Sequence, residues 1–228
     1  MGKNFYLVAA ALTAMSAVPA TAAVTVTSGS PSSFQVNFDG NVDRTSVSGL
    51  TSSILFGFLG TSLDGLTYNF TYMLSNTSSG SGITGSRVSG FAFNTTPDID
   101  SATVNGVFDN AFIGGTLPNG VKAVDICFNE ANKCSGGAGG GVTQGNSAGG
   151  TFALKFDVAP ATGSLSFDEF YVRYQSLNGT AFAKPDDSGT GAGTPALPVP
   201  EPATWGMMLL GFGIVGSALR RRRTYVIA

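Results

Sequence analysis

Apolar and polar residues alternate with a period of two over many short stretches of the chain. This pattern is typical of β-strands that bury one face and expose the other. The clearest stretches are residues 34–38, 68–74, 124–128 and 152–158, and weaker ones are 88–93 and 103–108. Residues 54–59 are apolar on both faces apart from Gly57, which predicts a central strand.

The alternation changes phase within residues 165–174. Leu165 and Phe167 fall on one parity, whereas Phe170, Val172 and Tyr174 fall on the other. An extra residue in a strand produces such a shift, so we expect a bulge or bend at Asp168 and Glu169.

Turn residues separate these stretches, and no helical stripe of ten residues occurs between the two ends of the chain. The chain holds 32 glycines, and its 17 phenylalanines suffice to fill one core. The sequence therefore predicts an all-β fold, a single jelly-roll-like β-sandwich of about nine short strands over residues 23–185. A closed barrel or a β-solenoid is the alternative, although no fixed-period repeat supports a solenoid.

The N-terminus has the features of a secretory signal peptide. Lys3 is followed by an apolar segment, residues 5–18, and then by the small residues Ala20 and Ala22 at an A-x-A cleavage site. Residues 1–22 are therefore expected to form a signal helix that the Sec translocon recognises and signal peptidase removes.

The C-terminus predicts a membrane span. Residues 203–219 carry no charge, and four arginines, Arg220, Arg221, Arg222 and Arg223, follow directly. A helix of this length spans about 25 Å, close to the hydrocarbon core, and the arginines should remain cytoplasmic. Residues 224–228 would be a short cytoplasmic tail. The Gly-, Ser- and Pro-rich residues 186–199 are expected to form a linker.

This C-terminus resembles the PEP-CTERM sorting signal of exported proteins from Gram-negative bacteria that make extracellular polysaccharide. The resemblance rests on Pro200, Glu201 and Pro202, the apolar span and the arginine cluster, over residues 200–223. It implies recognition by an exosortase, a membrane-embedded cysteine transpeptidase that cleaves near the motif. The protein would then lie transiently in the inner membrane before it reaches the cell surface or the extracellular matrix. A permanent single-span anchor is the alternative.

Composition excludes several kinds of site. The chain has no histidine, which removes Ser-His-Asp and Cys-His catalysis and His-ligated zinc. Residues 24–200 hold seven Lys or Arg and thirteen Asp or Glu, a net charge of about −6. An acidic body without basic clusters argues against nucleic acid as a partner.

Cys127 and Cys134 are the only cysteines, and an even pair in an exported protein predicts a disulfide. A glycine-rich run, residues 135–141, follows and lacks the Gly-Lys-Ser/Thr ending of a phosphate loop. It is expected to be a mobile loop that the disulfide holds at its base. The cysteine spacing with Ser-Gly-Gly resembles the cistern subgroup of PEP-CTERM proteins, which would add no known activity.

Few residues suggest a ligand. Asp98, Asp100 and Asp109 are weak calcium candidates, but their sequence is also typical of turns, so no cofactor is expected. Asp168 and Glu169 are adjacent and point to opposite faces of a regular strand, so they do not form a glycosidase pair. Tyr171, Arg173 and Gln175 are expected on an exposed strand face.

Three hypotheses follow. The first is a non-enzymatic, exported surface or matrix protein that an exosortase processes and that associates with exopolysaccharide or a biofilm. The second is a carbohydrate-binding module, which predicts an exposed aromatic platform or a calcium site. The third is a polysaccharide hydrolase or lyase, which no catalytic motif supports.

Overall fold

A computed structural model describes residues 23–29, 32–121, 123–136 and 139–196, together with residues 210 and 212. Within residues 23–196 the described chain is all-β, with one 3-10 turn at Ala161–Gly163. The strands are β1 (Val24–Thr27), β2 (Ser32–Val42), β3 (Thr45–Thr61), β4 (Thr67–Asn76), β5 (Gly85–Thr96), β6 (Ser101–Gly106), β7 (Asn110–Ile113), β8 (Ile126–Asn129), β9 (Val142–Thr143), β10 (Ser147–Lys155), β11 (Ser164–Asn178) and β12 (Asp187–Pro195).

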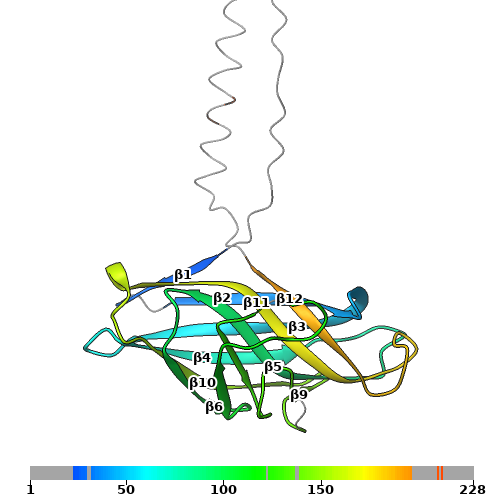
Figure 1. Ribbon diagram of the computed structural model, residues 1–228. Coiled ribbons are helices and arrows are strands. Elements are labelled where there is room, and N and C mark those ends of the chain that lie inside the picture. The colour runs from blue at the N-terminus through cyan, green and yellow to red at the C-terminus, as the bar shows by residue number, and fades with distance from the viewer. Residues whose placement is uncertain are drawn as a thin grey trace, which may run out of the picture.

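All twelve strands belong to one antiparallel sheet. Its order is β6-β10-β4-β3-β2-β12-β11-β5-β8-β7, with β1 added to β11 and β9 added to β5. The two outermost strands, β6 and β7, contact each other and are joined by residues 107–109 alone. The sheet therefore nearly closes on itself, and its two curved halves face each other across the core (Figure 1).

The predicted all-β, sandwich-like fold is confirmed, whereas the jelly-roll topology is not. The structure has twelve strands rather than about nine. Three of the extra strands, β1, β7 and β9, have only two to four residues, too few to show a period of two. The expected central strand is β3, which lies between β2 and β4. The predicted signal helix and membrane helix lie outside the described residues, apart from residues 210 and 212.

Phenylalanine rings fill the space between the two halves of the sheet. Twelve phenylalanines of the described chain are buried. Phe56 lies among them, with ring centroids 5.8 Å from Phe91, 6.2 Å from Phe152 and 6.0 Å from Phe170. Burial of each such side chain stabilises the fold by about 2–3 kcal/mol. The aromatic content of the sequence is therefore explained by one continuous core.

The predicted linker is wrong for most of its length. Residues 187–195 form β12, which lies between β2 and β11 in the middle of the sheet. The sequence resembles a linker because glycine occupies every second position. A side chain at any of these glycines would meet atoms of neighbouring strands, which are mostly Phe, Tyr and Val side chains beside Gly191 and Gly193 and the backbone of Asn41 beside Gly189. The domain therefore extends to Pro195.

Candidate functional site

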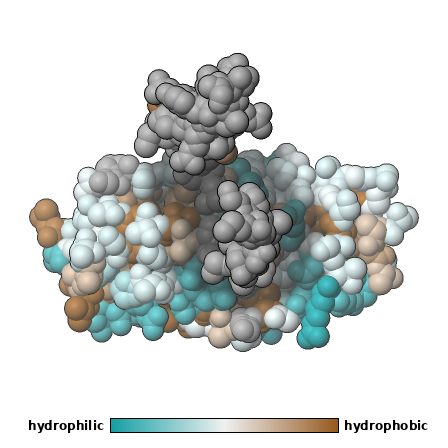
Figure 2. Space-filling view, turned by 90° about the horizontal axis from the view of Figure 1, so that it is seen from above, coloured by the Kyte–Doolittle hydropathy of each residue, from teal (hydrophilic) through white to brown (hydrophobic). Residues whose placement is uncertain are grey.

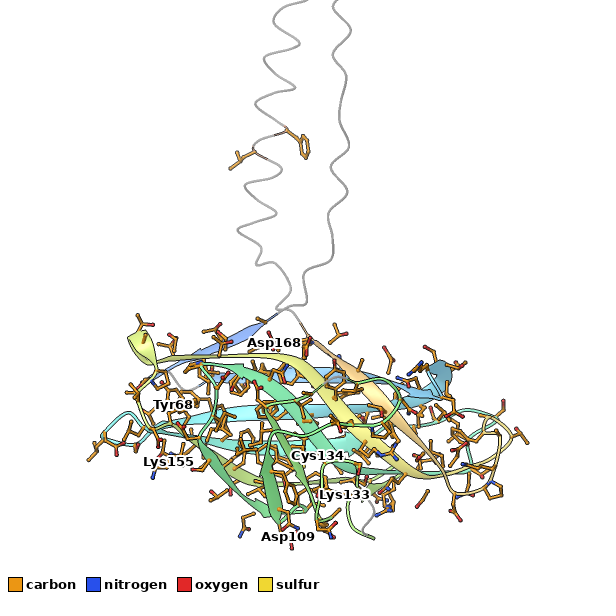
Figure 3. All side chains as sticks on the ribbon, in the orientation of Figure 1. Tyr68, Asp109, Lys133, Cys134, Lys155 and Asp168 are labelled. Carbon is orange, nitrogen blue, oxygen red and sulfur yellow. A yellow bond between two sulfur atoms is a disulfide. The ribbon has the colours of Figure 1, made fainter. Side chains whose placement is uncertain are left out.

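Strand β11 has a bulge, and the described domain begins and ends beside this bulge. The pairing of β11 with β5 shifts between Asp168 and Tyr171, and Glu169 has a φ of 48°. This confirms the bulge predicted at Asp168 and Glu169. Figure 3 shows Asp168 close to the place where the described chain enters and leaves the domain.

Strands β1 and β12 lie end to end on the same edge of β11. Val24 is opposite Phe167, and Ala192 is opposite Tyr171. The first residues of β1 and the last residues of β12 therefore flank the bulge (Figure 1). Seen from above, brown residues are interspersed among white and teal ones around this region (Figure 2). The predicted sorting signal thus follows a strand of the fold instead of a long tether.

The spacer between the fold and the predicted motif is short. Strand β12 ends at Pro195, and only residues 196–199 precede Pro200. Four residues of extended chain reach at most about 14 Å. An enzyme that recognises the motif must therefore approach the folded domain closely.

Inward-facing glycines let β12 lie against bulky neighbours. A Cβ at Gly193 would lie 2.6 Å from Cε1 of Phe38 and 2.7 Å from Cβ of Phe170. A Cβ at Gly191 would lie 2.8 Å from Cγ2 of Val172. All three distances are shorter than real Cβ contacts, so these positions have no room for a side chain. Sequence reasoning missed this role, although the alternation of glycine with Ser, Thr and Ala was a signal for a strand.

Arg173 connects β12 to the segment of residues 127–136, which contains the disulfide and which we call the disulfide loop. Its Nε donates to the carbonyl oxygen of Ser135 at 3.0 Å, and its Nη1 donates to the carbonyl oxygen of Gly189 at 2.7 Å. The side chain is 7% exposed. Burial lowers the pKa of Arg173, and the nearby carboxylate of Asp187 raises it. This buried cation therefore holds together two segments that are far apart in the sequence.

The predicted disulfide is present between Cys127 and Cys134. Both cysteines belong to a small second core with Ala92, Leu117 and Val124, and Phe112, Val121 and Tyr171 pack against it. Gly141 lies against the backbone of β5, since a Cβ there would be 2.2 Å from the carbonyl oxygen of Val88. At Gly141 the glycine run thus contacts the sheet directly; residues 137 and 138 lie outside the described chain.

The prediction of an exposed face at Tyr171, Arg173 and Gln175 is wrong. Arg173 is buried, and the other two residues are only partly exposed. The segment that includes the disulfide covers them, because Ser135 accepts from Arg173 and Gly136 lies against the Gln175 side chain. The sequence does not show this covering, because the contacts join residues about forty positions apart.

The calcium candidates do not come together. Asp98 and Asp100 precede β6, and Asp109 follows it, so a strand of six residues, about 20 Å long, separates them. Asp100 Oδ2 accepts from the backbone N–H of Asp157, and Asp109 Oδ1 accepts from Asn110. Within the part of the chain that the structure describes, no three acidic or cysteine side chains form a metal-binding group.

Three shallow hollows open on the described surface. One, of about 360 Å³, lies beside the disulfide between β7 and Lys133. The other two share the outer face of β2, β3, β4, β10 and β6. The hollow of about 420 Å³ is lined by Leu55, Gly57, Thr71 and Met73, and the one of about 380 Å³ by Asn69, Asn105 and Thr151 with their neighbours.

The expected aromatic platform is not found on the described domain. The large apolar residues exposed between residues 23 and 196 are Leu55, Leu59, Leu63, Met73, Ile113 and Val158, and none is aromatic.

The sorting residues Pro200, Glu201, Pro202 and Arg220–Arg223 lie outside the described residues. The helices that the structure does describe include none that is long and apolar enough to cross a membrane. The last strand of the described domain, β12, ends at Pro195, before these residues.

Comparison with known proteins gives one match. The family model of the PEP-CTERM protein-sorting motif matches residues 198–223, which include all three residues of the motif and the four arginines. No match was found among the curated proteins or among the solved structures. The chain therefore carries a PEP-CTERM protein-sorting motif at its C-terminus, which implies an exported protein that an exosortase processes.

Proposed function

We propose that this protein is a non-enzymatic component of the cell surface or extracellular matrix of a Gram-negative bacterium. An exosortase releases it from the inner membrane, and it then associates with exopolysaccharide or a biofilm. The observation that carries this proposal is the sorting motif at residues 198–223, directly after the last strand of the domain.

The disulfide and the net charge of the domain support a location outside the cytoplasm. Cys127 and Cys134 form a disulfide, and such bonds persist in oxidising compartments. Residues 24–200 carry a net charge of about −6, which favours solubility and repels other anionic polymers. Both features suit a domain that remains folded after release.

The surface hollows support a non-enzymatic role. None of the three hollows described above is lined by an aspartate or a glutamate. Glycoside hydrolysis generally needs two carboxyl groups within about 5–10 Å of each other beside the scissile bond. The chain also lacks histidine, the most frequent general base.

Processing is tested with variants of the motif. We expect Pro200→Ala and Glu201→Ala to accumulate as a membrane-bound form that retains its arginines and to disappear from the matrix fraction. Leu197→Ala, which lies just outside the matched residues, is the control and should be processed normally. Normal processing of both motif variants would refute the role of the exosortase.

A carbohydrate-binding module remains the second candidate function. The expected aromatic platform and calcium site do not support it. The two adjoining hollows on the outer face of β2, β3, β4, β10 and β6 do, and they indicate a different kind of sugar-binding surface.

A further inference from the structure

One broad face of the domain is left uncovered by the rest of the described chain. It consists of the outward side chains of β2, β3, β4, β10 and β6, which are neighbours in the sheet. We call it the threonine face. The disulfide loop covers part of β11, but no described segment covers the threonine face in the same way. Two of the three hollows open on this face.

Hydroxyl and amide side chains form rows across this face. Asn105 is opposite Thr151, Thr151 is opposite Thr71, Thr71 is opposite Gly57, and Gly57 is opposite Ser33. These five aligned residues come from five strands, so the row extends about 19 Å. The next rows add Thr103 and Asn69 on one side, and Gln35 on the other.

The two hollows meet in the middle of this row. Thr71 lines the first hollow and Thr151 lines the second, and these two residues are register partners. Gly57 also lines the first hollow, and the Thr71 hydroxyl lies beside it and donates to its carbonyl oxygen at 3.4 Å. Leu55 and Met73, also register partners, are 48% and 49% exposed at its edge.

Charge is nearly absent from the threonine face although the domain as a whole is acidic. Of the outward positions on the five strands, only Asp39 and Lys155 are charged, and they lie away from the central row. A polyanion would gain little attraction here and would meet the net negative charge of the domain. The face suits a ligand that is uncharged and rich in hydroxyl groups.

The same chemistry disfavours a protein partner. The cores of protein interfaces are enriched in aromatic residues and depleted of serine. The threonine face has no exposed aromatic residue and offers Leu55, Leu59 and Met73 as its only large exposed apolar side chains. A polysaccharide instead presents many hydroxyl groups, which donate and accept hydrogen bonds as serine and threonine hydroxyls do, together with C–H surfaces that a few apolar side chains can contact.

We propose that the threonine face binds a neutral polysaccharide chain along the Asn105–Ser33 row. Thr71, Thr151, Asn69 and Asn105 exchange hydrogen bonds with the sugar hydroxyls, and Leu55 and Met73 contact its C–H surfaces. This inference rests on the proposed association with exopolysaccharide and gives that association a surface and a ligand class.

The test is affinity electrophoresis of the full chain, purified in detergent, through gels that contain a neutral polysaccharide (a galactomannan or a β-glucan) or anionic alginate. We expect neutral gels to retard the protein, alginate not to do so, and added salt to change little, because no ion pair is involved. Failure of every neutral gel to retard the wild-type chain would overturn the proposal.

Matched variants locate the site. Thr71→Val with Thr151→Val removes two hydroxyl groups from the face with little change of shape, and Asn69→Ala with Asn105→Ala is an independent pair. We expect each pair to weaken retardation about tenfold. Thr25→Val with Thr27→Val, on exposed positions of β1, is the control and should bind as the wild type does.

The outcomes separate this inference from the proposed function. If both double variants of the threonine face bind the neutral polysaccharide as strongly as the control variant does, the face is not the binding site. Wild-type protein in the matrix fraction would still support matrix association. If the wild type never reaches that fraction, the proposed function itself fails.

Discussion

Val24 and Ala192 lie on the same edge of β11, on either side of its bulge, although 167 positions separate them in the sequence. The chain therefore enters and leaves the fold at one place. Since β12 lies between β2 and β11, the sheet is complete only when the residues just before the sorting motif have joined it. The residues just before the sorting signal are therefore part of the fold.

Removal of β12 should abolish the cooperative fold. We compare two exported chains, one that ends at Asp186 and one that ends at Ala196. The shorter chain leaves the edges of β2 and β11 unpaired and the core open to water. We expect a cooperative urea transition by circular dichroism for the longer chain alone. Equal transitions for the two chains would show that β12 is dispensable.

The inward glycines of β12 should not tolerate even a methyl group. Gly193→Ala brings a Cβ within 2.7 Å of Phe38, Phe170 and Val36. We expect a loss of about 1–3 kcal/mol in the free energy of unfolding, the usual cost of overpacking. Thr194→Ala, at the adjacent exposed position, should cost less than about 0.5 kcal/mol. Urea denaturation of both variants measures the difference, and equal losses would contradict the packing described here.

Arg173 should be far more important for stability than an exposed cation. Arg173→Met leaves the carbonyl groups of Ser135 and Gly189 without this donor and removes one of the two cations near the buried Asp187, the other being Lys184. Hydrogen bonds to charged groups typically contribute about 1.5–3 kcal/mol each, so we expect the free energy of unfolding to fall by at least about 2 kcal/mol. The control is Lys133→Met, at an exposed position. A similar unfolding midpoint for the two variants would refute the role of Arg173.

The disulfide should stabilise the domain by a moderate amount. Cys127→Ala with Cys134→Ala opens a loop of about eight residues, for which the chain-entropy model gives about 2.5 kcal/mol. Urea denaturation of this variant and of the wild type with and without reductant provides the measurement. Reductant should lower the stability of the wild type and leave the variant unchanged; no effect on the wild type would contradict this prediction.

Stability should fall at alkaline pH. Burial raises the pKa of Tyr72 from 10.0 to about 12, with a smaller opposing effect from the backbone N–H of Phe108, which donates to its hydroxyl. Burial also raises the pKa of Tyr174, whose hydroxyl is 2.7 Å from Ser52 Oγ. Between pH 10 and 12 the unfolded chain therefore binds fewer protons than the folded chain.

The sign of this effect follows from linkage. The two tyrosines should add no pH dependence below about pH 9, and above pH 10 the free energy of unfolding should decrease by up to about 1.4 kcal/mol per pH unit for each of them. Tyr72→Phe should flatten the decrease, and Tyr171→Phe, at a less buried position, should flatten it less. An equally steep decrease in the Tyr72 variant would contradict the assignment.

Local pattern was enough to predict the long strands. Residues 34–38, 68–74 and 165–174 alternate clearly, and all of them lie in strands, including the bulge at Asp168 and Glu169. The disulfide was also predictable, because two cysteines in an exported chain have few other roles. These features depend on neighbours in the sequence or on composition alone.

Long-range packing accounts for the errors. Gly191 and Gly193 are needed in their strand because Phe38, Phe170 and Tyr174 from other strands fill the space beside them, and Gly189 lies against the backbone of Asn41. Arg173 has the sequence context of an exposed strand position and becomes buried only when the disulfide loop covers it. The threonine face depends on the register of five strands, which the alternation of single strands does not determine.

The most direct test of the central claim is the intact mass and C-terminal peptide of the native protein, measured separately in membrane and matrix fractions. The account predicts a matrix form whose chain retains Pro195 at the end of β12, ends near residues 200–202 and lacks Arg220–Arg223. A protein that keeps these arginines and is found only in the membrane would contradict release by an exosortase.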